Sequence, residues 1–451
     1  MPRPGGAGTL QVKARAGAYL LLHAATGSEL RRYYREYLEQ DSKRCYPSAE
    51  SLLAETLLHA VTTVPQYREM IDAAEVRRDP FAALSRFPIM TKEAIQRRRS
   101  QLISEEGDLR RWHASRTGGS TGEPVELLHD NRYLAKSVAI REVYTTWAGG
   151  ALGSPELHIW GSERDLTERR ASPQKRFGDF LLRRRKLNCF DLSDAVIELL
   201  VTELRDSPPS LILAYVDAAH EIAQVLASRG WEVPPQRAMI ATAGTLYEPM
   251  RDRLEATFGC TVFNRYGTRE IGDMAGECEH GRLHVLPWSC HIEILRPNRE
   301  PVAPGEEGDV VVTSFTNRPM PMIRYLIGDR ARAPQSPGPC RCGRATAMLG
   351  GVAGRTVDMF LAPDGRRVDS GYFSIMVFER PWVRKFQVVQ TAPDRVVYRM
   401  VSDHGVPAED RRDITRKTKA KLGPECRVRF DEVADIEPSR SGKLRFTIRA
   451  F

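Results

Sequence analysis

The sequence predicts a mixed α/β protein: a large multi-sheet N-terminal domain, residues 1–357, and a small α+β C-terminal domain, residues 358–451. Three observations predict this class. Short apolar runs alternate with amphipathic helical patterns after about residue 157, which is typical of a parallel sheet covered by helices. A strand-rich stretch follows between residues 283 and 333. The segment after residue 358 then has the pattern of a hairpin, a basic helix and two further strands.

Composition limits the class of protein before any motif is considered. The chain has 451 residues, of which 28% are charged and 41% hydrophobic. This balance excludes a disordered tail, a collagen-like fibre and a polytopic membrane protein. The 67 basic residues outnumber the 58 acidic ones and give a net charge of +9 with histidine neutral. Nucleotides, free phosphates, nucleic acids and anionic membranes would all be attracted by that charge.

The elements follow from spacing and composition. Helices are predicted for the first hundred residues, where leucines recur at three- and four-residue spacing in Ser48–Leu58. In the central region we predict the strands Leu211–Tyr215 and Arg237–Thr242, and the helices Asp217–Arg229 and Pro249–Phe258. In the C-terminal domain we predict the hairpin Phe386–Gln390 with Arg395–Val401, the helix Glu409–Leu422 and a final strand pair. We place the domain boundary near Asp358.

The N-terminus carries a faint likeness to a signal peptide, because Lys13 and Arg15 precede the apolar run Ala18–Leu22. The run is short and lacks a clean cleavage site, so we predict instead a first helix that packs on the body. No stretch reaches the roughly 20 apolar residues that a membrane span requires. Eight cysteines in so long a chain do not form a disulfide scaffold. We therefore expect a cytoplasmic protein that does not bind membranes.

The sharpest motif is a loop rich in glycine and hydroxyl residues. It consists of Thr117, Gly118, Gly119, Ser120, Thr121 and Gly122, followed by Glu123 and Pro124. Glycines let the backbone turn tightly and bring N–H groups toward an anion, and hydroxyls donate to phosphate oxygens. No Gly-Lys-Ser/Thr follows, so the loop is not the lysine-bearing P-loop. By itself the loop is equally compatible with a surface turn.

Two further motifs carry carboxylates at predicted strand ends. Asn264–Glu270 follows the apolar Thr261–Phe263, and ligands of open α/β sheets bind at the carboxyl ends of parallel strands. Glu270 offers an oxygen to Mg²⁺, and a solvated pair with Arg269 is the alternative. Asn317–Asp329 is predicted to be a strand that ends in Gly-Asp. Its carboxylate could bind both hydroxyls of a ribose.

The last two motifs are Gly354–Asp358 and Arg440–Arg445. In this order the five motifs together resemble the adenylate-forming superfamily of acyl-CoA synthetases. Within it they resemble most the branch of phenylacetate-CoA ligase, CapK and coenzyme F390 synthetase. The resemblance runs from about Thr63 to the C-terminus and includes the segment Pro88–Lys92. It implies that residues 1–357 form an adenylation domain and residues 358–451 a mobile lid.

The resemblance also implies a nucleotide site. The loop Thr117–Gly122 would grip the triphosphate of ATP. Gly244 would lie near the adenine, and Tyr266 would stack on the adenine or border the acyl pocket. Asp329, assisted by Arg355, would bind the ribose. Gly267 and Thr268, next to Tyr266, are included among the nucleotide-binding residues.

The catalytic roles are implied in the same way. Glu270 would hold Mg²⁺, Asp358 would be the hinge, and Lys443 on the lid would contact the carboxylate and the α-phosphate. Arg269 stands where most of the superfamily has Thr or Ser that contacts the α-phosphate, and Val125 stands where many relatives outside the branch carry lysine. An arginine is a strong phosphate ligand, so Arg269 is assigned to catalysis. The implied acyl pocket consists of Tyr215, Trp160, Ala243 and Tyr266.

A separate set of residues suggests a metal. Cys278, His280 and His284 lie in one segment, and Cys340 and Cys342 in another. Three thiolates and one imidazole can complete a tetrahedral structural Zn²⁺ site, and ordinary buried thiols are the alternative. Members of the branch often carry such a site, and the resemblance favours His284 over His280.

The resemblance implies an enzyme, an ATP-dependent acid–thiol ligase that forms AMP. It would adenylate a small, aryl carboxylic acid and transfer the acyl group to CoA or a carrier thiol. One alternative is an adenylate-forming enzyme with another acceptor, either an amine or a cofactor hydroxyl. Another is a basic nucleic-acid-binding protein, but Arg97–Arg99 and Arg183–Lys186 lie in charge-mixed surroundings that favour solvated faces. We expect no nucleic-acid partner, and the sequence leaves the oligomeric state open.

Overall fold

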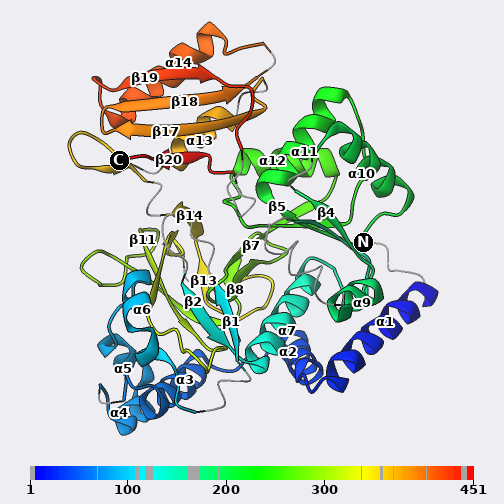
Figure 1. Cartoon of the computed structure of the whole chain (residues 1–451), viewed down its shortest axis with the longest axis vertical. Coiled ribbons are helices and arrows are strands. Elements are labelled where there is room, and N and C mark those ends of the chain that lie inside the picture. Colours follow the sequence, from blue (N-terminus) through cyan, green and yellow to red (C-terminus); the bar gives the residue numbers. More distant parts are fainter. Residues whose placement is uncertain are drawn as a thin grey trace. The chain divides into compact units, whose positions relative to one another are not determined.

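The computed structural model describes the chain from residue 6 to residue 451, except for residues 69, 107–111, 117–124, 161–172, 190–191, 337, 356–358, 369, 379, 381, 403 and 438–443. The chain divides into two compact units that alternate along the sequence. The first unit comprises residues 1–156, 172–185 and 263–352, and the second comprises residues 157–171, 186–262 and 353–451. Figure 1 labels their helices and strands.

Helices begin the first unit, as the leucine spacing predicted. They are α1 (Gly6–Ala25), α2 (Leu30–Lys43), α3 (Ala49–Thr63), α4 (Ala73–Arg78), α5 (Pro80–Arg86) and α6 (Lys92–Arg98), with the 3₁₀ turn Arg99–Leu102. The Ser48 side chain starts α3 by accepting from the Ser51 N–H at 3.1 Å, a typical N-cap. On this helix Leu53 and Leu57 are fully buried. Helix α1 buries Tyr19 and Leu20 and contacts α2 and α9 (Pro173–Leu181), so the predicted packing helix is present.

Two sheets and a hairpin complete the first unit. The hairpin pairs β1 (His113–Arg116) with β2 (Glu126–His129) and leads into α7 (Asn131–Trp147). One sheet segment contains, in order, β13 (Met348–Leu349), β9 (Leu283–Val285), β8 (Gly272–Glu277) and β7 (Thr261–Thr268). The other contains β10 (Cys290–Leu295), β11 (Glu307–Ser314), β12 (Tyr325–Arg332) and β14 (Gly351–Arg355). One apolar core joins these sheets to the N-terminal helices.

The second unit contains the α/β pattern that the sequence predicted. Its sheet segment runs in the order β6 (Ala238–Thr242), β5 (Leu211–Tyr215), β3 (Glu156–Trp160) and β4 (Arg184–Asn188). Strands β5 and β6 are parallel and fully buried. The helices are α10 (Asp194–Asp206), α11 (Val216–Arg229) and α12 (Glu248–Phe258). Helices α11 and α12 end at Gly230 and Gly259, whose left-handed φ angles of 64° and 57° suit glycine at a helix terminus.

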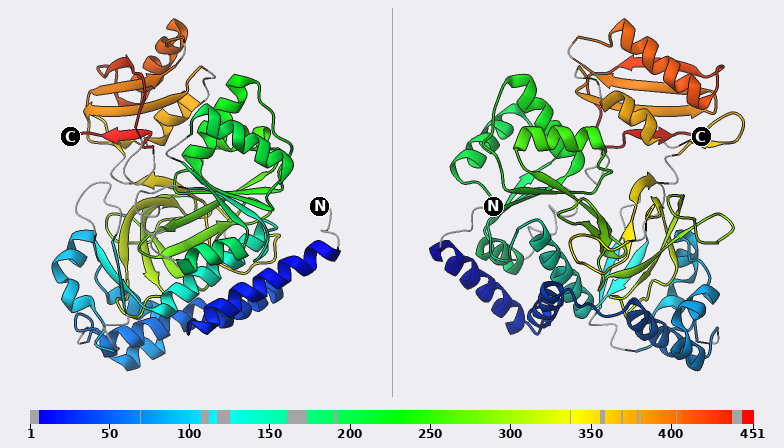
Figure 2. Two further views of the ribbon diagram at one scale, coloured as in Figure 1. Left: turned by 45° about the vertical axis from the view of Figure 1, so that its right-hand side comes forward. Right: turned by 180° about the vertical axis from the view of Figure 1, so that it is seen from behind.

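The C-terminal segment of this unit is an α+β sheet structure. It contains β15 (Phe360–Leu361), β16 (Arg367–Val368), α13 (Gly371–Phe378), β17 (Lys385–Ala392), β18 (Arg395–Val401), α14 (Ala408–Leu422), β19 (Arg427–Glu432) and β20 (Thr447–Arg449). The right-hand view of Figure 2 shows α13 and α14 on the same face of the four-stranded sheet. The hairpin of β17 with β18 and the helix α14 confirm the predicted elements.

The prediction that the final two strands pair with each other was wrong. Strand β19 lies parallel to β18, and β20 lies parallel to β17, so the two strands occupy opposite edges of the sheet. Strand β19 can lie parallel to β18 because α14 provides the crossover connection that a parallel neighbour requires.

No helix in the described ranges is both long and apolar enough to span a membrane. All eight cysteines are free thiols.

We expect Gly276→Ala to destabilise the first unit. A Cβ at this position would lie 2.1 Å from the ring of Tyr144, which is fully buried and donates from its hydroxyl to the Asn264 carbonyl at 3.0 Å. Overpacking of this kind costs about 1–3 kcal/mol, measurable by urea unfolding. Gly17→Ala in α1 is the matched control, because nothing lies within 4 Å of its added Cβ. Equal stability of the two variants would contradict the close approach.

Candidate functional site

The implied adenine and ribose residues meet in the first unit. The hydroxyl of Tyr266, on β7, donates to Oδ2 of Asp329, on β12, at 2.9 Å. Tyr266 is buried and Asp329 is half-buried, so the carboxylate is held by the phenol while part of its surface reaches solvent. The fold therefore brings together two residues that are 63 positions apart in sequence.

Both residues lie beside irregularities of their strands. The register of β7 with β8 shifts between Tyr266 and Gly267. On β12, Ile327–Asp329 lie between residues paired with Asp309 and Val311, so these three residues face a single residue of β11. Bulges of this kind redirect side chains and are frequent next to active sites. Gly328 allows the second bulge through its φ of 84°.

The predicted ends of these two strands need correction. Strand β7 does not stop at Phe263 but continues through the motif to Thr268. Strand β12 does not end at Gly328-Asp329 but continues to Arg332. The bulges allow each strand to stay paired through residues of low strand propensity. The predicted strand ends came too early because they were based on composition.

Arg269 and Glu270 lie in the turn between β7 and β8. Arg269 is exposed and Glu270 is half-buried. Burial, together with the smaller effect of the negative charges of Asp273 and Glu270, raises the pKa of the Tyr133 phenol to about 12. Two carboxylates therefore act on one buried hydroxyl here. Carboxylates are oxygen ligands of the kind that Mg²⁺ prefers, and the magnesium role of Glu270 stays a prediction.

The implied acyl-pocket residues of the second unit lie at strand ends. Trp160 is the last residue of β3, Tyr215 the last of β5, and Ala243 follows β6 directly. The rings of Trp160 and Tyr215 are in contact, with centroids 4.4 Å apart. Ala243 has a φ of 68°, which is uncommon for a residue with a Cβ and marks a sharp turn. Neighbouring strands thus deliver these residues to one edge of the sheet segment.

Gly244 follows at the same edge and is enclosed by its neighbours. A Cβ there would lie 3.2 Å from Oδ1 of Asp217, so a larger residue would crowd this carboxylate. The other carboxylate oxygen of Asp217 accepts from the Leu444 N–H at 3.1 Å. A Cβ on Gly354 would lie 3.8 Å from Oγ1 of Thr245. Residues of two predicted motifs, Gly354 and Leu444, therefore lie close to Thr245 and Asp217, the neighbours of Gly244.

Several predicted residues lie outside the described ranges. These are Thr117, Gly118, Gly119, Ser120, Thr121 and Gly122, the hinge residue Asp358, and Lys443. Arg355 is described only through its backbone, as the last residue of β14. Strands β1 and β2 flank the glycine-rich loop, and the backbone of Arg116 is paired with that of Glu126. Val125 is buried, which is consistent with an apolar residue at this position.

The cysteines and histidine predicted to bind a metal come together in the first unit. One ligand atom each from Cys278, His284, Cys340 and Cys342 lie within 4.8 Å of one another. The Sγ atoms of Cys278 and Cys340 are 3.7 Å apart, and Sγ of Cys342 is 3.4 Å from Nε2 of His284. Tetrahedral zinc with bonds of roughly 2.3 Å to sulfur requires S···S separations of roughly 3.8 Å. The four side chains therefore fit this ion.

Neighbouring groups hold the four side chains in place. His284 Nδ1 lies 3.0 Å from Oγ1 of Thr346, which directs Nε2 toward the thiols, as outer partners of metal-binding histidines do. Sγ of Cys278 accepts from the His280 backbone N–H at 3.4 Å, and the side chain of His280 is exposed. Arg344, beside Cys342, pairs with Glu279 at 2.8 Å and with Asp41 of α2 at 3.4 Å. Its guanidinium also lies over the Trp147 ring of α7.

Comparison with known proteins places these features in a family. The family model described as the CapK C-terminal domain matches residues 360–450. Protein CapK of Staphylococcus aureus is 22% identical over 374 residues, which cover 81% of this chain and 80% of that protein. Phenylacetate-coenzyme A ligase of Escherichia coli (strain K12) is 26% identical over 321 residues, 68% of this chain and 70% of that protein.

The relatives of this chain are named CapK and phenylacetate-CoA ligase, and its structural neighbours are acyl-CoA ligases of the adenylate-forming superfamily. CapK and the phenylacetate-CoA ligases are its homologues, as the motif order indicated. A crystal structure of 2-hydroxyisobutyryl-CoA ligase in complex with 2-HIB-AMP has the same fold, with a TM-score of 0.70 at 16% identity. That comparison covers 90% of this chain and 89% of the ligase. A phenylacetate-coenzyme A ligase of Thermus thermophilus is 25% identical, although the match spans 63% of its length.

Two residues beside these clusters carry no motif in the sequence. Asp217 belongs to no motif, but its position just after the buried strand β5 is a signal that could have identified it. Arg344 connects the cysteine–histidine cluster to two helices, and no local pattern marks it, because its partners are far away in sequence.

We expect Asp217→Ala to loosen the C-terminal segment at Leu444. The variant removes a carboxylate that accepts from the Leu444 N–H, and hydrogen bonds to charged groups contribute about 1.5–3 kcal/mol. Hydrogen–deuterium exchange at this amide should become faster by roughly tenfold or more. Asp252→Ala, an exposed position on α12, is the control. Unchanged exchange in the Asp217 variant would mean that this contact does not hold the segment.

Proposed function

We propose that the protein is an ATP-dependent acid–thiol ligase. It converts a small carboxylic acid, with an aryl acid as the first class to test, into an acyl-adenylate and pyrophosphate. It then transfers the acyl group to CoA or a similar thiol and releases AMP. The names of its homologues support this reaction, and the contact between the rings of Trp160 and Tyr215 supports an aromatic acid.

The hydrogen bond between Tyr266 and Asp329 carries the proposal. A half-buried carboxylate held by a phenol is a suitable acceptor for two vicinal hydroxyls, since an ionised carboxylate has two acceptor oxygens. The nucleoside would therefore be bound through its ribose at Asp329, with Tyr266 beside the base. The loop Thr117–Gly122 would supply donors to the phosphates, and Gly244 would leave room for the adenine.

The chemistry requires stabilisation of negative charge. A carboxylate is a poor electrophile, and its attack on the α-phosphate concentrates negative charge around that phosphorus. Preorganised positive groups lower such a barrier most effectively. Lys443 and Arg269 would provide these charges. Positioning of the two substrates would provide much of the remaining decrease in the activation barrier. Mg²⁺ held by Glu270, when bound, would neutralise phosphate charge.

We propose further that residues 358–451 act as a lid that turns at Asp358. The match of the CapK C-terminal domain to residues 360–450 supports a separate module here. In one orientation the lid would deliver Lys443 for adenylation. Rotation would then withdraw the lysine and open a path for the thiol, and such hinge motions commonly complete a catalytic site in stages. The hydrogen bond of Asp217 to Leu444 would favour the orientation for adenylation.

The four-residue cluster is proposed to bind one structural Zn²⁺. All four positions are filled by protein ligands, which is typical of structural rather than catalytic zinc. The ion would fasten the β8–β9 hairpin to the loop Cys340–Thr346. Arg344 would extend this attachment to α2 and α7.

We expect Lys443→Ala to reduce acid-dependent ATP–pyrophosphate exchange by at least about a hundredfold, because loss of a charge that acts in the transition state costs about 3 kcal/mol or more. Lys421→Ala, on α14 outside the motif, is the control and should leave exchange unchanged. Exchange at the wild-type rate in the Lys443 variant would remove the catalytic assignment.

The acceptor is tested by product analysis over a panel of acids with and without CoA. Acid-dependent AMP release that requires CoA supports the ligase. A stable adenylylated product or an amide would support the other acceptors, and salt-sensitive DNA or RNA binding without exchange would refute the proposed class.

We expect about one zinc per chain in protein purified without chelators, as a single four-ligand site requires. The double variant Cys340→Ser/Cys342→Ser should lose the metal and unfold at lower temperature, since metal binding contributes folding free energy. Cys45→Ser is the control, because this thiol is exposed and lies outside the cluster. Elemental analysis that finds no zinc in the wild-type protein would refute the site.

A further inference from the structure

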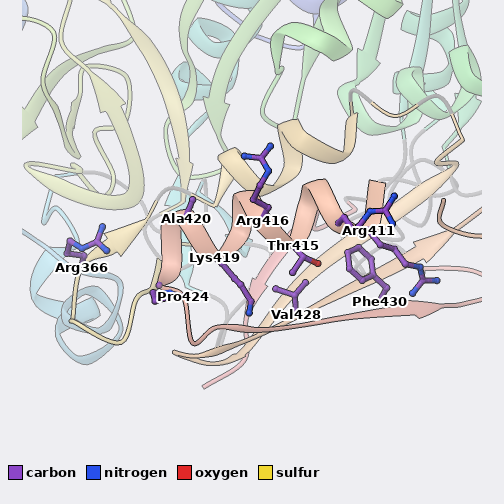
Figure 3. Close-up of a pocket in the computed structure, with 11 residues that line it drawn as sticks. Arg366, Arg411, Thr415, Arg416, Lys419, Ala420, Pro424, Val428 and Phe430 are labelled. Carbon is purple, nitrogen blue, oxygen red and sulfur yellow. The ribbon is translucent and has the colours of Figure 1, made fainter. Parts of the chain in front are cut away.

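The C-terminal domain carries a basic groove that the proposed reaction does not use. It has a volume of about 1060 Å³ and lies along α14 and β19. Figure 3 shows Thr415 and Lys419 on the side of α14 that faces Val428 and Phe430, with Arg411 beside the ring. The remaining α14 residues that line it include Arg412 and Arg416. We call this feature the α14 groove.

Helical periodicity produces its basic wall. Arg411, Thr415 and Lys419 are spaced by four residues, and so are Arg412, Arg416 and Ala420. Residues spaced by four lie on one helix face, so the six positions form a continuous stripe over about 13 Å of helix at 1.5 Å per residue. A stripe of this length is matched by about two and a half turns of a second helix.

The floor of the groove is apolar. It is formed by alternate residues of the edge strand β19, Val428 and Phe430, which are half-buried. Arg427 and Arg429, the alternating residues on the same strand, are exposed and point to the other face. A basic rim above an apolar floor fits a partner that is amphipathic and acidic rather than one that is only charged.

The charges on the rim are not all neutralised. Arg411 pairs with Glu432 at 2.7 Å, and Arg416 pairs with Asp413 at 2.6 Å. Arg412 and Lys419 are exposed, and neither occurs in an ion pair found among the described residues. Residues 360–451 contain nineteen Lys and Arg against thirteen Asp and Glu, a net charge of +6 out of the +9 of the whole chain.

The surroundings of Phe430 argue against a nucleotide or single-stranded nucleic acid as the occupant. Such ligands are bound by stacking bases on exposed aromatic faces. Here the ring of Tyr398 is stacked against Phe430, with centroids 5.2 Å apart, and the Arg411 guanidinium lies 5.3 Å from its centroid. The ring already has its partners, and among the described residues it is the only aromatic one that lines the groove.

We propose that the α14 groove binds an acidic amphipathic helix of a protein partner. Acidic side chains on one face of that helix would pair with Arg412, Arg416 and Lys419, and its apolar face would cover Val428 and Phe430. This is recognition of a helix in a groove, in which charge complementarity accelerates association and excludes basic partners. The proposal does not depend on the reaction assigned to the active site.

The test measures binding of a fluorescein-labelled helical peptide by anisotropy, with the full-length protein. The probe carries Glu on one face and Leu on the other, and its counterpart carries Lys in place of Glu. We expect the Glu peptide to bind and the Lys peptide not to bind. Arg412→Glu/Lys419→Glu should weaken binding by about tenfold or more, because repulsion replaces attraction at two sites.

Arg427→Glu/Arg429→Glu is the matched control, since it makes the same change of charge on the outward face of β19. Arg412→Gln/Lys419→Gln provides a milder second variant, and circular dichroism checks that α14 remains folded in each. Equal losses of affinity in the test and control variants would overturn the proposal, because binding would then depend only on net charge. Equal binding of the Glu and Lys peptides would also overturn it. Displacement of the bound probe by CoA, by single-stranded DNA or by phosphatidylserine vesicles, but not by unlabelled Glu peptide, would reassign the groove.

Discussion

The hydrogen bond between Tyr266 and Asp329 is the contact on which the proposed nucleotide site of the first unit depends. It connects strands of two different sheets and fixes the direction of a carboxylate that is only half-buried. The extra residues beside Asp329 lie on β12 itself, whereas the extra residue beside Tyr266 is Met274 of the partner strand β8, and the sheets remain paired on either side. The proposed site therefore lies beside bulges in sheets that are otherwise regularly paired.

The cysteine–histidine cluster lies in the same unit and is proposed to have a structural role. Four polar ligand atoms converge where β8, β9 and the loop before β13 meet. Such a concentration of thiols would be poorly satisfied by hydrogen bonds alone, because thiols are weak donors and acceptors. A bound Zn²⁺ would satisfy all four. Arg344 carries the effect outward to Asp41 and Trp147, so the N-terminal helices and the sheet are held by one connected network.

In the second unit, the sheet strands position the residues of the proposed acyl pocket. Their carboxyl ends place Trp160, Tyr215 and Ala243 at one edge, and Asp217 adds a contact with the C-terminal segment at Leu444. The same C-terminal domain concentrates positive charge on one face of α14, away from the segment that contains Lys443 in sequence. The domain is thus proposed to have two separate surfaces, one for catalysis and one for a protein partner.

Sequence alone determined the element types, the five motifs and the superfamily, because hydrophobic periodicity, turn residues and motif order are local properties. It also identified the cysteines and the histidine that come together, although only folding could show that their ligand atoms lie within 4.8 Å. The bulges beside Tyr266 and Asp329, the parallel placement of β19 and β20, and the contacts of Asp217 and Arg344 were decided by tertiary structure. The physical reason is the same in each case: strand pairing, crossover geometry and buried ion pairs depend on residues that are distant in the chain, and no local pattern encodes such partners.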